Sequence, residues 1–295
     1  MVRFLQTVIG GLTIGGVYAV IAVALNLQWS ASGVLNLAVA EFAVLGALIT
    51  IELHDVGGLN LVLTVLLVLA GAFLLGIGEH EVVLGRMRRG RRFSTMPFVI
   101  TLGFALVLRG LAERRWGRDF FSLPSFSGNA PLRLGDVRVP TQSLWVLGTA
   151  ILVSLILWAL FRYTLWGKAF QSCADNREAA SLMGINPGRV TRFTFGIGGL
   201  LAALAGIVIA PIAFISYQSG LPLLLNCFIA AAIGGFGRTS GAVVGGVLVG
   251  LLSALASGYV SSLYADAFVF ALLLVVLVVR PAGILGSAVD VAKRA

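Results

Sequence analysis

The stretch "NREAASLMGIN", residues 176–186, is a short polar-edged segment in a chain that is otherwise strongly apolar. Of the 295 residues, 59% are hydrophobic and 11% are charged, whereas a soluble domain is nearer half apolar and a quarter charged. Apolar runs of about 20 residues, the length a helix needs to cross a bilayer, recur on both sides of the stretch. Because a bilayer cannot satisfy open backbone groups, the sequence predicts an all-α, polytopic transmembrane helix bundle.

Eight or nine membrane segments, some short or broken, are expected within one domain covering residues 1–295. They lie at about 5–26, 38–53, 59–82, 95–112, 142–162, 193–215, 222–236, 240–258 and 264–280. The seventh is short, and the stretch "QWSASGVLNLAVAEF", residues 28–42, is broken by small polar residues. Paired interrupted segments in the two halves of a transporter can mark its pathway, but ordinary loops at the headgroups explain the pattern equally well.

Positive charge predicts the orientation. With nine crossings, 14 of the 21 basic residues fall on one face. These are Arg86, Arg88, Arg89, Arg91, Arg92, Arg162, Lys168, Arg177, Arg189, Arg192, Arg238, Arg280, Lys293 and Arg294. The positive-inside rule makes this face cytoplasmic, so the N-terminus is expected outside and the C-terminus inside. The long outer loop 113–141 also carries arginines, and "PLRLGDVRVP", residues 131–140, alternates like a short pair of strands.

The opening stretch is then part of a cytoplasmic loop, residues 163–192. Helix formers throughout residues 169–184 predict one helix of about three turns with a partial apolar stripe. Gly184 is a plausible stop, and Pro187 prevents a simple continuation. The small side chains of Ala179 and Ala180 permit close approach by another protein; an amphipathic helix lying on lipid is the alternative.

Glu41 is the one acid well inside an apolar segment, and such a carboxylate normally faces a partner or a cavity. Two interpretations are open: a residue of the transport pathway, or a carboxylate at a helix start, stabilised by the amide dipoles of its own segment. Arg109 is the basic counterpart near the outer end of its span, where snorkelling to the headgroups is the favoured interpretation.

No ATPase loop of the type G-x-x-x-x-G-K-[ST] occurs, because Gly167-Lys168 is followed by Ala169. The chain is therefore expected to lack an ATPase site and to bind no cofactor. His54 and His80 are too far apart, with too few other ligands, to predict a metal site. Cys173 and Cys227 imply neither a disulfide framework nor a metal cluster. The net charge of +9 is explained by orientation and not by nucleic-acid binding.

Three stretches of the sequence resemble the same protein family. They occur in the same order as in the family, and the resemblance covers nearly the whole chain. They are "GGVYAVIAVALNLQWSASGVLNLAVAEFAVLGA", "SCADNREAASLMGINPGRVTRFTFGIGGLLAALAGIV" and "FIAAAIGGFGRTSGAVVGGVLVGLL", the last followed by "RPAGILG". The sequence is similar to the H-type permease of the branched-chain amino acid (Liv-type) importers, which are ABC importers of the bacterial inner membrane. Glu178-Ala179-Ala180-x-x-x-Gly184 matches the motif by which such permeases seat into their ATPases. One departure is clear: the family often reads Asn-Phe-Ala-His-Gly-Glu where residues 36–41 read Asn-Leu-Ala-Val-Ala-Glu.

The resemblance implies a set of partners and site residues. The partners would be a second related permease subunit, two ATPase subunits that hold ATP and Mg²⁺, and a periplasmic substrate-binding protein. The cargo would be a branched-chain or other small amino acid, with urea, short amides and small carboxylates used by relatives. The implied ATPase-coupling residues are Arg177, Glu178, Ala179, Ala180, Gly184 and Asn186. The candidate pathway residues are Asn36, Glu41, Gly234 and Gly235. A secondary transporter or channel working alone is the alternative function, and a membrane enzyme is a weaker one.

Overall fold

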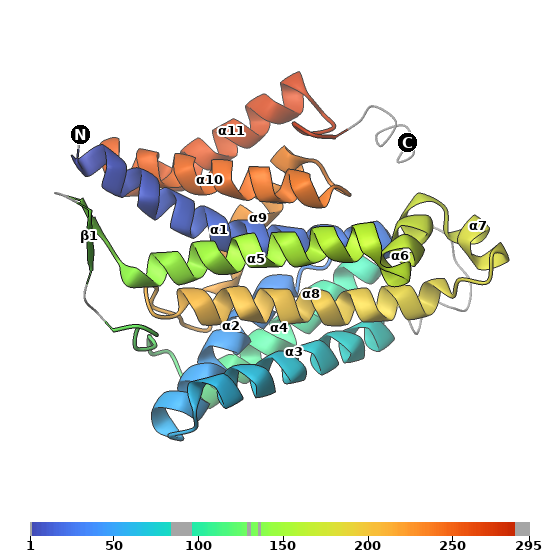
Figure 1. Ribbon diagram of the computed structural model, residues 1–295, viewed down its shortest axis with the longest axis horizontal. Coiled ribbons are helices and arrows are strands. Elements are labelled where there is room, and N and C mark those ends of the chain that lie inside the picture. The colour runs from blue at the N-terminus through green and yellow to red at the C-terminus, as the bar shows by residue number, and fades with distance from the viewer. Residues whose placement is uncertain (1, 84–95, 129–130, 135–136, 287–295) are drawn as a thin grey trace.

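The computed structural model describes residues 2–83, 96–128, 131–134 and 137–286. Within these ranges the chain is a helix bundle with one small strand pair (Figure 1). The helices are α1 (Val2–Ser32), α2 (Val39–Ile51), α3 (Leu61–Val83), α4 (Met96–Trp116), α5 (Thr141–Tyr163), α6 (Leu165–Asp175), α7 (Arg177–Leu182), α8 (Pro187–Ile209), α9 (Gly220–Gly234), α10 (Thr239–Tyr259) and α11 (Ala265–Val279). A π-helical turn, η1 (Glu52–Val56), extends α2, and a 3₁₀ turn, η3 (Ser262–Tyr264), precedes α11.

The nine expected membrane segments are present as α1, α2, α3, α4, α5, α8, α9, α10 and α11. Seven described helical segments are long and apolar enough to cross a bilayer: α1, α3, α4, α5, α8, α10 and Ser262–Val279. The remaining two, α2 and α9, have 13 and 15 residues. Helix α9 is the seventh segment, which the sequence predicted to be short, and α2 follows the break inside the interrupted stretch 28–42. The largest boundary errors are at the end of α1, which reaches Ser32 instead of 26, and at α8, which is shifted by the same amount. Helix α8 begins at Pro187 instead of 193 because Asn186 caps it and proline suits a first helical turn.

Successive spans run in alternating directions between two ends of the bundle (Figure 1). The N-terminus lies at one end, together with the strand pair β1 (Leu132–Leu134) and β2 (Val137–Val139), which confirms the expected pairing in residues 131–140. At the same end, Phe121 pairs its backbone with Ile215. Helices α6 and α7 lie at the opposite end, where α3 and α11 finish and α4 and α10 begin. The basic cluster Arg86–Arg92 and the terminal Lys293 and Arg294 lie outside the described residues.

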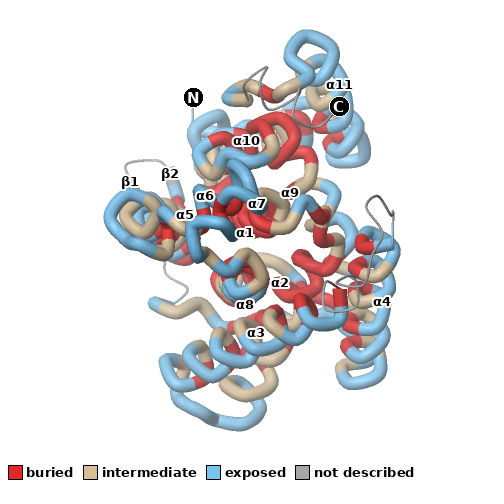
Figure 2. The backbone as a smooth tube through the Cα atoms, turned by 90° about the vertical axis from the view of Figure 1, so that its right-hand side faces the viewer, coloured by how far each residue is buried: buried red, intermediate tan, exposed pale blue. Residues whose placement is uncertain are grey.

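Helix α1 runs through the centre of the bundle, between α10, α8, α9 and α5 (Figure 2). The second half of α1 is buried, and so are α2 and most of α8. In contrast, α3, α4, α5 and α11 expose large apolar side chains on the outside of the bundle. Leu66, Leu106, Leu155 and Leu274 are examples, each more than half exposed in the isolated chain. A polytopic bundle places such side chains against lipid or against other membrane subunits.

Glycines allow the central helices to touch. Gly11 and Gly15 on α1 face Gly246 and Gly250 on α10, so that each helix presents two glycines four residues apart. A Cβ added at Gly250 would overlap the backbone of Gly15. Backbone contact of this kind is the usual means of helix association in a bilayer, where burial of apolar surface gives no advantage over contact with lipid. Close packing is therefore the structural role of the glycines in this helix pair.

The α1–α10 contact gives a first prediction. Gly250→Ala should destabilise the purified protein by about 1–3 kcal/mol, because the two backbones must separate to admit a methyl group. Gly71→Ala on α3 is the matched control, since nothing lies within 4 Å of a Cβ added there. Thermal unfolding in detergent, followed by light scattering or a thiol dye, measures the difference. Equal melting temperatures for the two variants would contradict the proposed role of the glycine contact.

Candidate functional site

The segment 176–186 forms a short helix that is capped at both ends. Asn176 has an extended backbone, and its side chain accepts hydrogen bonds from the amides of Glu178 and Ala179 at 3.0 Å each. Gly184 adopts φ 82°, and the amide of Ile185 bonds to the carbonyl of Ala180 at 3.1 Å. These are the hydrogen bonds of an N-cap and of a Schellman C-cap, so Gly184 stops the helix as predicted.

The expectation of one continuous helix over 169–184 was wrong. The chain forms two helices, α6 and α7, and turns between them at Asn176. The physical reason is the asparagine side chain, which satisfies the first amides of α7 and so competes with continuation of α6. At the other end, Asn186 accepts a hydrogen bond from the Arg189 amide at 3.1 Å and caps α8. Asn186 thus positions the following helix.

The two alanines of α7 have different surroundings. Ala180 is buried against the chain itself, whereas Ala179 is exposed. At the tip of the helix, Leu182 and Met183 are 87% and 83% exposed. Helix α7 therefore presents an apolar tip beyond the end of the bundle (Figure 1). The buried side chain of Ala180 packs α7 against the rest of the chain.

Arg177 connects α7 to the centre of the bundle. Its guanidinium donates to the carbonyl of Ser32 at 3.3 Å and to the hydroxyl of Thr191 at 3.2 Å. Ser32 is the last residue of α1, where carbonyls lack partners within the helix and attract a cation. Partial burial lowers the pKa of the Arg177 guanidinium, which still remains charged at neutral pH because its ordinary value is so high.

The link between α1 and α2 contains a buried polar cluster. Gly33 takes φ 68° and ends α1. Asn36 is fully buried and donates to Gln28 at 2.9 Å and to Glu79 of α3 at 3.0 Å, while its own oxygen accepts from the amide of Ala38 at 2.8 Å. One asparagine thus holds α1, α3 and the start of α2 together. Sequence reasoning selected Asn36 and missed Gln28 and Glu79, which stand near span ends and carry no local signal of burial.

Glu41 lies in the first turn of α2 and forms an ion pair with Arg109 of α4. The guanidinium donates from Nη2 at 2.6 Å and from Nε at 3.2 Å, and the glutamate side chain is 4% exposed. The interpretation of Arg109 as a snorkelling residue was therefore wrong, because a buried carboxylate offers the cation a partner at close range. The carboxylate also contacts Gly220, the first residue of α9, where an added Cβ would overlap it.

The four candidate pathway residues do not converge. Asn36 and Glu41 flank the start of α2. The part of α9 that contacts Glu41 is its first residue, Gly220. Gly234 and Gly235 lie at the other end of α9, where Gly234 packs on Gly241 and Gly235 turns the chain at φ 103°. The turn between α9 and α10 thus covers residues 235–238.

Other expectations concerned metals and thiols. Within the described part of the chain, no group of three or more His, Cys, Asp or Glu side chains is close enough to hold a metal ion. Cys173 and Cys227 are both free thiols and buried. His80 packs edge-on against Phe195, and its Nδ1 lies 3.5 Å from Oε1 of Glu81.

The fold shows the class of protein: the chain is a multi-pass helical membrane protein, with a short capped helix at one end and broken segments in its centre. It belongs to the branched-chain amino acid transport system / permease component family, whose model matches residues 7–277. Members are permease subunits of ABC importers, in which separate subunits carry the ATPase. This assignment excludes the alternative of a transporter working alone. It also places the chain in the inner membrane and implies ATPase and substrate-binding partners.

Individual relatives agree with the family. The chain is 29% identical over 302 residues to the high-affinity branched-chain amino acid transport system permease protein LivH of Salmonella typhimurium, covering 96% of each chain. It is 28% identical over 297 residues to BraD of Pseudomonas aeruginosa, the permease of a system with the same description, again covering 96% of each. A shorter match, 35% over 120 residues, covers 40% of this chain and 33% of the autoinducer 2 import system permease protein LsrC of Escherichia coli.

The Glu41–Arg109 pair gives a second prediction. Arg109→Met should destabilise the protein by about 3–5 kcal/mol, because it leaves a buried carboxylate without its cation, and adding Glu41→Gln should restore much of the loss. The exposed pair of Arg118 with Glu113 is the control, and Arg118→Met should leave the melting temperature close to that of the unmodified chain, because water screens an exposed ion pair. Melting temperatures of the single and double variants in detergent test this coupling. If the destabilisations caused by Arg109→Met and Glu41→Gln simply add in the double variant, the pair does not hold α2 to α4.

Proposed function

We propose that the chain forms half of the translocation pathway of an ABC importer for branched-chain or other small amino acids. It works with a second related permease subunit, two ATPase subunits that bind ATP and Mg²⁺, and a periplasmic substrate-binding protein. The cargo proposal is supported by the relatives that align over 96% of the chain. Because Val39 and Ala40 replace the His and Gly that the family often has, the cargo of this chain can differ from that of its relatives.

The observation that carries the coupling proposal is the form of α7. A helix of 6 residues has little stability by itself, yet this one is capped at both ends and projects an apolar tip into solvent. Leu182 and Met183 are suited to insert into a groove of an ATPase subunit, with Glu178 and Ala179 beside them. Loop 163–192 is the coupling loop in this proposal.

Arg177 supplies a route from α7 to the membrane centre. Motion of α7 on closure of the ATPase dimer is transmitted through the guanidinium to the end of α1. That end is followed within a few residues by the Asn36 cluster and by Glu41, which face α3, α4 and α9. Because ATP binds one arrangement of the ATPases better than the other, nucleotide shifts the population of the permease between inward-open and outward-open states.

The coupling proposal is tested by Leu182→Glu, with Leu263→Glu as control. Leu263 is 82% exposed and lies just before α11, at the opposite end of the bundle. Leu182→Glu should reduce both recovery of the ATPases with the purified permease and uptake of labelled leucine at least tenfold, since a charge in an apolar groove costs more than about 1.4 kcal/mol. Leu263→Glu should leave both unchanged.

Normal ATPase recovery and uptake with Leu182→Glu would overturn the coupling proposal and favour a helix that merely lies on lipid. Normal ATPase recovery with no uptake of leucine, isoleucine or valine by the unmodified complex would instead overturn the assignment of branched-chain amino acids as the cargo and leave other small amino acids.

The proposed orientation puts the N-terminus in the periplasm and the C-terminus in the cytoplasm. The end that carries α7 also carries Arg162 at the end of α5 and the basic residues Lys168 and Arg189 of loop 163–192, as the positive-inside rule requires of a cytoplasmic face. Ser181→Cys and Ser262→Cys place single exposed thiols at opposite ends, while both native cysteines are buried. A membrane-impermeant maleimide added to intact spheroplasts should label position 262 and not position 181. Labelling of 181 alone would reverse the orientation.

A further inference from the structure

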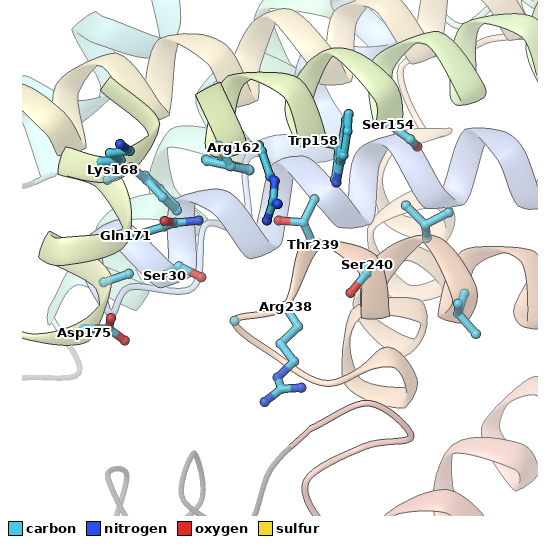
Figure 3. A pocket seen from close by; sticks show the side chains of 16 residues that line it. Ser30, Ser154, Trp158, Arg162, Lys168, Gln171, Asp175, Arg238, Thr239 and Ser240 are labelled. Atoms are coloured by element: carbon cyan, nitrogen blue, oxygen red, sulfur yellow. The ribbon is translucent and has the colours of Figure 1, made fainter. Parts of the chain in front are cut away.

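A cavity of about 980 Å³ lies at the α7 end of the bundle, between the last turns of α1 and α5, helix α6, and the start of α10 (Figure 3). Three cationic side chains line it: Arg162 from the last turn of α5, Lys168 from α6, and Arg238 immediately before α10. One carboxylate, Asp175, also lines it, so the cavity wall carries a net positive charge. This cavity is separate from the Glu41 and Asn36 clusters.

The labelled polar side chains lie around the cavity, with Lys168 and Asp175 on α6 and Arg238 and Ser240 at the start of α10. Figure 3 shows Arg162 between Gln171 and Trp158, with Thr239 next to it, and Asp175 at the far end from Trp158. Thr239 and Ser240 open helix α10, whose preceding residue supplies no side-chain cap. The first amides of a helix attract anions, and here they add to the charge of the cationic side chains.

The cavity also has an apolar side that faces the depth of the membrane. Trp158 stands one turn inside the end of span α5, and Val243 and Val244 stand one turn inside span α10. Trp158 is 56% exposed and packs edge-on against Tyr163, which is 71% exposed. Exposed aromatic residues at the end of a span are typical of the membrane–water interface. The cavity therefore spans the height at which a lipid headgroup meets its acyl chains.

From this combination we propose that the cavity binds an anionic phospholipid, with its phosphate at Arg162, Lys168 and Arg238 and its acyl chain along Trp158 and Val244. Basic pockets between membrane helices at the interface recognise phosphate-bearing lipid headgroups. A bound lipid joins α5 and α6 to α10 at the base of the segment that carries α7. The site does not depend on the identity of the cargo or on the direction of transport.

The test uses the purified chain in detergent and native mass spectrometry. Phosphatidylglycerol is titrated, with phosphatidylcholine and inorganic phosphate as separate additions. The cavity variant is Arg162→Gln with Lys168→Gln. The control variant is Arg189→Gln with Arg280→Gln, which removes the same charge from the same end of the bundle outside the cavity lining. The cavity variant should bind phosphatidylglycerol at least tenfold more weakly than the unmodified chain, because each cation near the headgroup contributes to its attraction.

A second variant guards against loss of folding. Ser240→Asp puts a carboxylate in the first turn of α10, where it favours the helix but repels a phosphate in the cavity. It should keep the melting temperature of the unmodified chain and lose phosphatidylglycerol binding. Equal binding by the cavity and control variants would overturn the proposal in favour of unspecific annular lipid. Displacement of phosphatidylglycerol by inorganic phosphate would show a free-anion site. In a separate pull-down, weaker recovery of the ATPase subunits with the cavity variant, at unchanged lipid binding, would overturn the proposal and assign the cations to a protein interface.

Discussion

Close approach of helix backbones at glycine is the contact on which the rest of this bundle depends. Apolar side chains gain nothing by leaving lipid for one another, so helices associate where small residues let their backbones touch. Gly250 meets Gly15 in this way, and Gly206 of α8 meets the backbone of Ala43 of α2. These contacts fix α1 between α10 and α8 and place the short helix α2 against its neighbours.

The tight centre determines which polar groups can be buried. An ionised or amide side chain at membrane depth needs partners close by. Asn36 finds them in Gln28 and Glu79, and Glu41 finds one in Arg109. Both clusters flank the break between α1 and α2, so the interrupted segment is a place where four helices are tied together by polar contacts. In the proposed transport mechanism a change of state rearranges these contacts, so the break is the proposed hinge.

The α7 end of the chain connects this break to the proposed ATPase surface. Arg177 bonds to the last carbonyl of α1, so displacement of α7 acts directly on the residue before the hinge. Ala180 is buried at the base of α7, while Leu182 and Met183 extend outward. The helix is thus held firmly on one side and open on the other, which is the arrangement expected of an element that transmits movement between subunits.

The sequence by itself determined the elements that depend on near neighbours in the chain. The membrane segments, the strand pair in 131–140 and the stop at Gly184 all follow from hydropathy or from residues within one helical turn. The family resemblance, carried by three ordered stretches, gave the function. Only the tertiary structure decided the pairing of Arg109 with Glu41, the burial of Ala180, the partners of Asn36 and the contact of Arg177 with α1. These contacts involve residues on different helices, far apart in the chain, so no sequence periodicity predicts them. The helix faces that meet in a bilayer are determined by the fit of small residues across the whole bundle.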